Sequence, residues 1–267
     1  MHKPQFRKPV RNLHMLGLAD DTADVNAYRK GGEPAIVWAA DYGTPALVKA
    51  LLVRGAKVDA RDKMGCTALQ YVVGNTIVTR RHIKNAQLLI AHGADVNTRE
   101  NDGYTPLMSA HNTKMLHLLL KRGAKVNAAA NDGFTALMDS VLEGSPEQMA
   151  LLLAAGADVH ARDSEGFTSL LLVASWLNEF SHEEDMAETK LLLEYGASVN
   201  DCDNKGKSVL WHAVRRMQRN PKAHEVVRLL LEAGAEAADE NGSRLLAWAA
   251  KNGDEEIAAL LVAAGAK

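Results

Sequence analysis

The chain has 267 residues, enough for one or two globular domains with a sizeable core. It carries 31 basic and 33 acidic residues, and the formal net charge of -2 gives no bulk attraction to nucleic acid or an anionic membrane. No apolar run approaches the roughly 18 residues of a membrane-spanning helix, and no secretory signal begins the chain. We expect a cytoplasmic protein, with translocation as an effector left open.

The N-terminal segment precedes the regular part of the chain. Residues 1–10 are basic and are expected to be a disordered tail. Residues 11–30 are predicted to form a degenerate N-terminal cap, because Thr22–Ala27 reads Thr-Ala-Asp-Val-Asn-Ala and matches a motif that recurs further along the chain. We predict that residues 31–267 form a single repeat domain.

A unit of about 33 residues recurs through that domain, with insertions and one deletion. Each copy contains a Gly-Ala pair that follows a leucine-rich segment, and a second glycine comes ten residues later in most copies. The Gly-Ala glycines are Gly55, Gly93, Gly123, Gly156, Gly196, Gly234 and Gly265. The repeats therefore run approximately over 31–63, 64–101, 102–131, 132–164, 165–204, 205–240 and 241–267.

Each copy contains the signals of two short helices and a turn. Hydroxyl residues such as Thr105 and Thr135 follow the second glycine, where their side chains can cap a first helix. Ser145-Pro146 is a start signal for a second helix, and the Gly-Ala glycine suits the end of that helix. A short extended segment with a polar tip such as Asn101-Asp102-Gly103 then predicts a hairpin-like loop, the finger. The fold class predicted is an all-α repeat solenoid.

These residues resemble the ankyrin repeat family. Thr105-Pro106-Leu107 stands where that family has Thr-Pro-Leu-His, and Gly93–Asn97 matches its Gly-Ala-Asp-Val-Asn. The resemblance implies helix-turn-helix units with hairpin fingers, and binding on the concave surface of finger tips and first helices. The motif histidine is absent in every copy, with Gln70, Met108 and Met138 among its replacements. We expect apolar packing to substitute for it at most positions.

Catalytic and metal-binding patterns are missing from the sequence. No phosphate-binding loop, zinc-protease helix or metal-spaced cysteine pair occurs, so we expect no catalytic residue, no metal and no cofactor. Cys66 and Cys202 lie four repeats apart and are not expected to form a disulfide.

Three charged inserts fall between the paired helices of repeats 2, 5 and 6. The acidic insert of repeat 5 and the basic insert of repeat 6 are interpreted as neutralising each other, with a charged docking edge as the alternative. The insert of repeat 2, with Arg80, Arg81, His82 and Lys84, has no obvious acidic partner and is the better candidate for an accessory contact.

The residue after the finger glycine is aromatic in three successive repeats, at Tyr104, Phe134 and Phe167. Trp176 is expected to extend this row, whereas Trp38, Trp211 and Trp248 are expected in the core. Exposed rings in a row are typical of binding hot spots, and the alternative is that they pack on one another and stiffen the fingers. The flanking charges complete the predicted site: Arg61, Lys63, Arg99, Asp132 and Arg162.

These features favour a non-enzymatic module or scaffold that binds a protein or peptide. A mixed-charge rim around apolar anchors suits such a partner better than a nucleic acid backbone. The alternative is a bacterial effector or immunity-type protein that blocks one target. An enzyme, a nucleic-acid binder or a membrane protein is disfavoured, and we expect a monomer.

Overall fold

A computed structural model describes residues 24–29, 31–175, 182–217, 224–238 and 240–267. These residues form thirteen helices and no strand, with isolated β-bridges only at Tyr28–Pro34, Ala129–Thr135 and Cys202–Ser208. The chain divides into two compact units, Met1–Lys125 and Val126–Lys267. The single domain over 31–267 stays a prediction, as do the tail and the cap boundaries.

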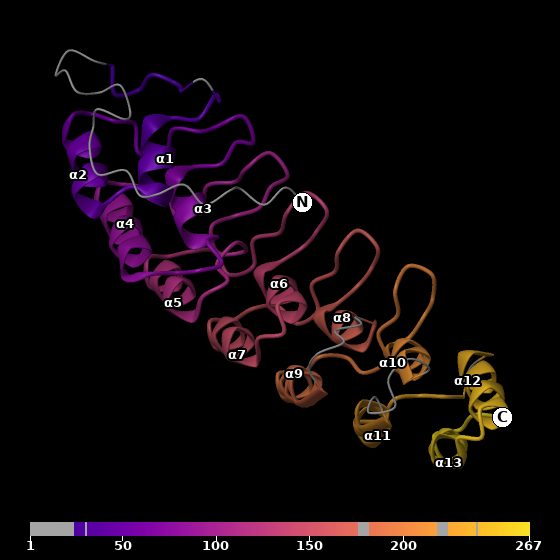
Figure 1. Cartoon of the computed structure of the whole chain (residues 1–267). Coiled ribbons are helices and arrows are strands. Elements are labelled where there is room, and N and C mark those ends of the chain that lie inside the picture. The colour runs from indigo at the N-terminus through magenta and orange to yellow at the C-terminus, as the bar shows by residue number, and fades with distance from the viewer. Residues whose placement is uncertain (1–23, 30, 176–181, 218–223, 239) are drawn as a thin grey trace. The chain divides into compact units, whose positions relative to one another are not determined.

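The first unit holds five helices, and they lie in two layers (Figure 1). They are α1 (Ala35–Tyr42), α2 (Pro45–Val53), α3 (Ala68–Val73), α4 (Arg80–Ala91) and α5 (Thr113–Lys121). The first helix of one repeat packs on the first helix of the next, α1 on α3, and the second helices α2 and α4 do the same. We call the two layers the inner and the outer helices.

The second unit continues the same alternation. Its inner helices are α6 (Ala136–Leu142), α8 (Ser169–Ser175), α10 (Val209–Met217) and α12 (Glu240–Lys251). Its outer helices are α7 (Pro146–Ala154), α9 (His182–Glu194), α11 (His224–Glu232) and α13 (Glu255–Ala263). Contacts run along each layer, α6 to α8 to α10 and α7 to α9 to α11 to α13.

The predicted capping residues begin several of these helices. The hydroxyls of Thr44, Thr135 and Ser145 accept the N–H groups three residues ahead, and a proline follows Thr44 and Ser145 directly. The Ser145-Pro146 start is therefore confirmed. Two similar start signals in the sequence, Ser181-His182 and Asn220-Pro221, include residues that lie outside the described part of the chain.

Repeat 3 departs from the prediction. The helix expected after Thr105 is a single turn over 106–109, closed by the Ser109 N–H on the Thr105 carbonyl at 3.2 Å. Repeat 3 is the shortest internal copy, and only eight residues separate Gly103 from Asn112, which caps α5. The deletion therefore falls in the inner helix, because the remaining residues suffice for one turn only.

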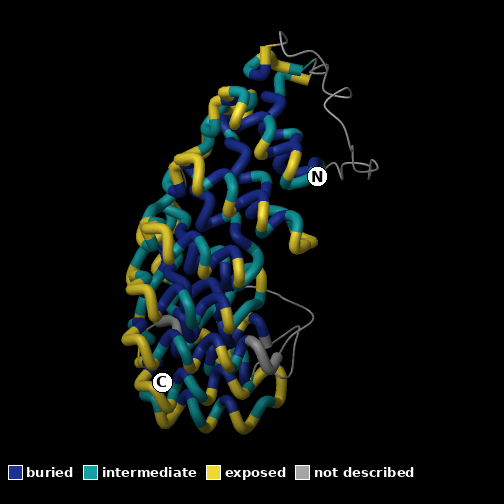
Figure 2. Tube along the Cα trace, turned by 90° about the vertical axis from the view of Figure 1, so that its left-hand side faces the viewer, coloured by how far each residue is buried: buried dark blue, intermediate teal, exposed yellow. Residues whose placement is uncertain are grey.

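The core lies between the two helix layers of each unit, and buried and exposed residues alternate along the helices (Figure 2). Fully buried side chains include Leu51, Leu69 and Leu89 in the first unit and Leu137, Leu171 and Leu230 in the second. These positions repeat because each helix turns the same face to the layer behind it, which is the period of an amphipathic helix.

An asparagine in each of several fingers links two repeats. The Asn97 carboxamide donates to the Gly123 carbonyl at 3.2 Å and accepts the Lys125 N–H at 2.8 Å. Asn127 does the same in the second unit, with Gly156 at 3.0 Å and Asp158 at 2.8 Å. One side chain thus satisfies a free carbonyl at a helix end and an N–H of the next finger.

One motif-histidine position keeps a polar link. The Gln70 side chain accepts the Thr67 N–H at 3.0 Å and donates to the Tyr104 carbonyl of the next repeat at 3.0 Å. Met138 and Leu171 at equivalent positions are buried and apolar. Apolar packing therefore replaces the histidine there, as expected, but Gln70 preserves a hydrogen bond between repeats.

The charged inserts serve the packing of neighbouring repeats. Arg216 is 4% exposed, forms an ion pair with the buried Asp185 carboxylate, and donates to the Val173 carbonyl at 2.9 Å. The predicted neutralisation between repeats 5 and 6 is therefore confirmed for this pair. In the insert of repeat 2, Arg81 donates to the Tyr42 and Asp41 carbonyls at the end of α1, so this residue links two repeats. An accessory contact through the rest of that insert stays a prediction.

Candidate protein-binding surface

Four of the described fingers are closed by a carboxylate near their start. In the second unit the Asp163 side chain accepts the Glu165 N–H at 2.9 Å and the Phe167 N–H at 2.8 Å. Asp62, Glu100 and Asp203 make the same pair of contacts in their fingers. Two N–H groups bound by one carboxylate fix the tight turn, so each of these four fingers presents a defined edge.

Two of the predicted site residues fasten one finger to the next. The Arg61 guanidinium donates to the Gly65 carbonyl at 2.8 Å in its own finger and to the Arg99 carbonyl in the following finger. Arg162 repeats this with Gly166 and Cys202, both at 2.8 Å, and forms an ion pair with Asp201 at 2.6 Å. These arginines hold the fingers in register.

The other predicted charges lie at finger tips. Lys63 and Arg99 are exposed in the first unit, and Asp132 is exposed in the second. The Asp132 carboxylate accepts the Phe134 N–H at 3.0 Å, and its backbone carbonyl accepts the Ser164 N–H at 2.6 Å. Trp176 lies outside the described residues.

The three predicted rings are each half-buried, with Tyr104 in the first unit and Phe134 and Phe167 in the second. The ring of Phe167 packs against His212 of the next repeat, with centroids 5.3 Å apart and planes at 55°. This ring therefore contributes to the packing between repeats 5 and 6, but its partner is a histidine of an inner helix and not another ring of the predicted row.

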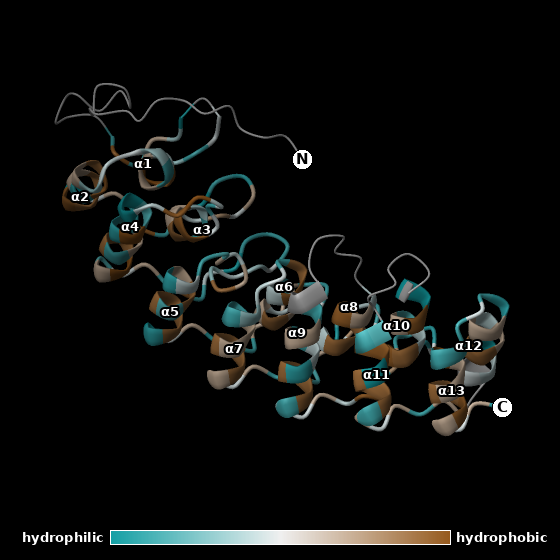
Figure 3. Cartoon of the chain, turned by 60° about the horizontal axis from the view of Figure 1, so that its bottom comes forward, coloured by the Kyte–Doolittle hydropathy of each residue, from teal (hydrophilic) through white to brown (hydrophobic). Residues whose placement is uncertain are grey.

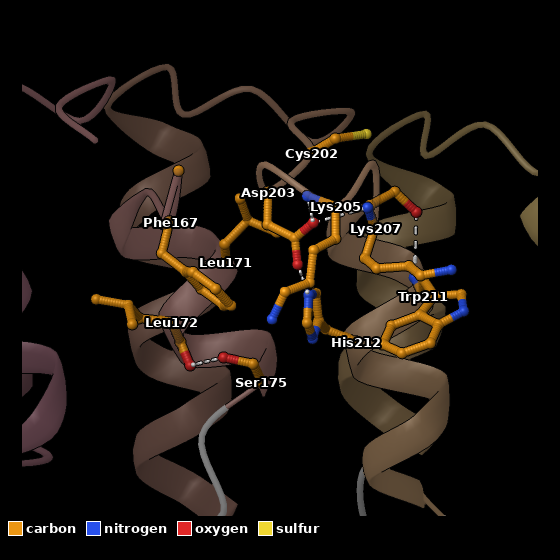
Figure 4. A network of polar contacts seen from close by, with 12 residues as sticks. Phe167, Leu171, Leu172, Ser175, Cys202, Asp203, Lys205, Lys207, Trp211 and His212 are labelled. Atoms are coloured by element: carbon orange, nitrogen blue, oxygen red, sulfur yellow. Dashed lines mark hydrogen bonds and ion pairs between the residues drawn. The ribbon is translucent and has the colours of Figure 1, made fainter. Parts of the chain in front are cut away.

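His212 belongs to a cluster that the sequence did not indicate (Figure 4). Its imidazole lies 3.0 Å from the Asp203 carboxylate and makes an edge-on contact with Trp211, at 5.0 Å between centroids. Lys207 and Arg215 place their cations 4.8 Å from the Trp211 ring. The result is an aromatic surface with positively charged edges between a finger and an inner helix.

Burial sets the protonation of this cluster. It lowers the pKa of His212, and the neighbouring Asp203 carboxylate offsets only part of that effect. Burial also raises the pKa of Asp203, but the Lys207 N–H, the His212 side chain and the Lys205 N–H together outweigh it and lower the pKa below its usual value. At neutral pH the pair is a neutral imidazole beside a carboxylate.

In the first unit, a tyrosine replaces the histidine that contacts the finger carboxylate. Tyr71 stands nine residues after the finger carboxylate Asp62, as His212 does after Asp203, and its hydroxyl donates to Asp62 at 2.6 Å. Trp38, which stands like Tyr71 four residues after the helix-capping position, lies under the Arg29 guanidinium at 4.8 Å. A comparison of this position across repeats is the signal that would have found these residues.

Two exposed apolar side chains were also missed. Met64 is 57% exposed at a finger tip where other repeats have Asp102, Asp132, Glu165 or Lys205, and Tyr28 is 61% exposed in the first described finger. An apolar residue at a turn position that is otherwise charged is a sequence signal for a contact surface.

The expectation that Trp38, Trp211 and Trp248 belong to the core is wrong. All three are only partly buried. For Trp38 and Trp211 the reason is their place on the inner helix, where the rings lie against the cations of Arg29, Lys207 and Arg215.

In the described part of the chain, no group of three or more His, Cys, Asp or Glu side chains could hold a metal ion. Among the described helices, none has the length and apolar character to cross a membrane. Cys66 and Cys202 are half-buried thiols in different units. Burial, then Asp62 and Glu100, raise the pKa of Cys66 to about 11, so this thiol stays protonated.

Comparisons with known proteins agree with the repeat geometry. A family model described as ankyrin repeats in three copies matches residues 10–100, 36–130, 78–163, 137–237 and 170–267. An ankyrin repeat protein of Acanthamoeba polyphaga mimivirus is 30% identical over 114 residues, which are 43% of this chain and 14% of that protein. The chain thus spans a small part of that viral relative's length.

A solved structure shares the fold. The ankyrin repeat domain from Acinetobacter baumannii AYE has a TM-score of 0.65 and 32% identity, covering 75% of this chain and 98% of that domain. The predicted all-α repeat solenoid is confirmed by this likeness and by the helical structure of the described residues. The chain belongs to the ankyrin repeat family, whose repeats are generally protein–protein interaction modules.

Proposed function

We propose that the chain is a non-enzymatic interaction module that binds a protein or peptide on its finger and inner-helix surface. The observation that carries the proposal is the cluster of Phe167, Trp211 and His212, in which partly exposed rings adjoin the cations of Lys207 and Arg215. Aromatic rings with adjacent arginine or lysine are the residues that contribute most to binding energy in protein interfaces.

The contacts that hold the rings of Phe167, Trp211 and His212 in place support the same proposal. Each ring is already held by a neighbour, so a partner would meet side chains that have lost most of their rotamer freedom. Lys63 and Arg99 supply exposed positive charge on fingers of the first unit, where Arg61 holds two fingers together. Asp132 supplies exposed negative charge in the second unit, where Arg162 plays the role of Arg61. The other aromatic residues of the proposal are Tyr104 in the first unit, and Phe134 and the sequence-predicted Trp176 in the second.

The proposal also covers a protein that blocks one target, because inhibition and scaffolding use the same kind of surface. The proposed setting is the cytoplasm, and the proposed functional state is a monomer. In each case the partner contacts side chains, and no covalent step is involved.

A photo-crosslinking residue placed at single positions tests the location of binding. Lys63 and Lys205 are exposed at finger tips, and Glu225 is exposed on the outer helix α11 as a matched control. In extract from the native source we expect one protein to crosslink from a finger position and not from Glu225. Crosslinking from Glu225 alone would overturn the finger surface as the binding site.

A further inference from the structure

A second surface lies on the opposite layer of the first unit. A groove of about 630 Å³ runs between the outer helices α2 and α4 and reaches the end of α5, which both views place beside α4 (Figures 1 and 3). Its apolar lining residues are Pro45, Ala46, Leu88 and Ala91, and we refer to them as the apolar floor. We call it the basic groove.

The rim of the basic groove carries charge of one sign. Lys49 on α2, Lys84 on α4 and Arg122 after α5 line it, all three are exposed, and the remaining polar residue is the neutral Gln87. None of the lining residues is acidic. Three cations around an apolar floor form a site for a ligand that combines carboxylates with apolar side chains.

The outer helices of the two units differ in charge, and the excess of cationic residues is confined to the first unit. The helices α2, α4 and α5 contain no Asp or Glu but six cationic residues: Lys49, Arg80, Arg81, Lys84, Lys114 and Lys121. The outer helices of the second unit contain ten acidic residues and only two cations, Lys190 and Arg228. A chain with a net charge of -2 thus concentrates positive charge on one layer of one unit.

We propose that the basic groove binds an acidic amphipathic helix of a partner protein, separately from the finger surface. Such a helix would place its leucine-like side chains on the Leu88 floor and its carboxylates against Lys49, Lys84 and Arg122. The lining residues include no aromatic ring on which a base could stack, which disfavours single-stranded nucleic acid. The groove is open and three-sided, which disfavours a small enclosed ligand.

The test uses the full chain and a fluorescent synthetic helix with Leu on one face and Glu elsewhere. Fluorescence anisotropy should show binding that weakens with salt, while a helix with Lys in place of Glu, or Ser in place of Leu, should bind at least about tenfold more weakly. The triple variant Lys49→Glu, Lys84→Glu, Arg122→Glu should lose at least about tenfold in affinity.

A matched triple variant distinguishes the effect of losing the groove cations from the effect of changing the net charge of the chain. Lys57→Glu, Lys114→Glu, Lys125→Glu changes the same number of exposed cations in the same unit, outside the groove, and should bind normally. Equal losses in both variants, or no binding of the Leu/Glu helix to the parent chain, would overturn the proposal. So would a preference for oligothymidylate or for phosphatidylserine vesicles. If the groove variant melts early, Lys49→Gln and Lys84→Gln replace it, each removing one exposed charge.

Discussion

The ring of Phe167 and the imidazole of His212 lie 5.3 Å apart between centroids, across the boundary between repeats 5 and 6. This contact links the finger of one repeat to the inner helix of the next. Because His212 also contacts Asp203 and Trp211, the finger position after the glycine is tied to the whole cluster.

Replacing Phe167 by Ala should lower the free energy of unfolding by about 1–2 kcal/mol, because a half-buried ring and one aromatic contact are lost. Urea unfolding at neutral pH measures the change. Phe167→Leu keeps much of the buried area and should lose less. Equal stability of Phe167→Ala and the parent chain would show that the contact with His212 contributes nothing to the fold.

His212 should make stability depend on pH. Burial lowers the pKa of His212 in the folded state, whereas in the unfolded chain the imidazole keeps an ordinary pKa of about 6.5. As the pH falls through about 6.5, the unfolded chain therefore binds a proton that the folded chain does not yet bind. His212 has no effect on the free energy of unfolding above that pH, and it lowers this free energy as the pH drops towards the folded-state pKa. His212→Tyr, which imitates Tyr71, should make the fall from about pH 7.5 to 5.5 shallower. An unchanged slope in urea unfolding would contradict this assignment.

The Asp185–Arg216 pair should show the behaviour of a buried ion pair. Arg216→Ala leaves the Asp185 carboxylate buried without its cation and should cost about 3 kcal/mol or more in unfolding free energy. The double replacement Asp185→Leu with Arg216→Met removes both charges, and its cost should be smaller by about 2 kcal/mol. Calorimetry or urea unfolding of the variants decides it. A double variant as unstable as Arg216→Ala would show that packing at this position matters more than the charge.

Alanine substitutions at two glycines distinguish two causes of lost stability, which are a strained backbone conformation and steric crowding of the added Cβ. Gly156 has a φ of +89° and no neighbouring atom within 4 Å of the place where a Cβ would lie, so Gly156→Ala should cost about 1 kcal/mol. Gly166 has a φ of +86°, and an added Cβ would lie 2.8 Å from the Asn204 backbone nitrogen. Gly166→Ala should therefore cost at least about 1 kcal/mol more. Equal melting temperatures of the two variants would contradict the close approach of the fingers.

The repeat architecture could be predicted from sequence because its signals are local. Capping hydroxyls, prolines and glycines such as Thr135, Pro146 and Gly156 act within a few residues, and the period repeats them. The single turn of repeat 3 was missed because the deletion could be counted but not assigned to one helix. Its position depends on how the shortened segment packs.

Less of the candidate surface could be predicted from the sequence. The position after the finger glycine singled out Phe167 in the sequence, but the contact of this ring with His212 depends on the stacking of two repeats. Arg61 and Arg162 looked like free rim charges, whereas their partners are carbonyls of a finger about forty residues away. Pairings over such separations follow from the three-dimensional register of repeats, which one sequence does not specify.

Binding on the finger and inner-helix surface is tested by the affinity of the chain for the crosslinked partner. The triple variant Tyr104→Ala, Phe134→Ala, Phe167→Ala is compared with the parent chain by isothermal titration, below the melting temperature of both. We expect an affinity loss of at least about tenfold, or about 1.4 kcal/mol. An unchanged affinity together with a lowered melting temperature would contradict the claim and leave these rings a purely structural role.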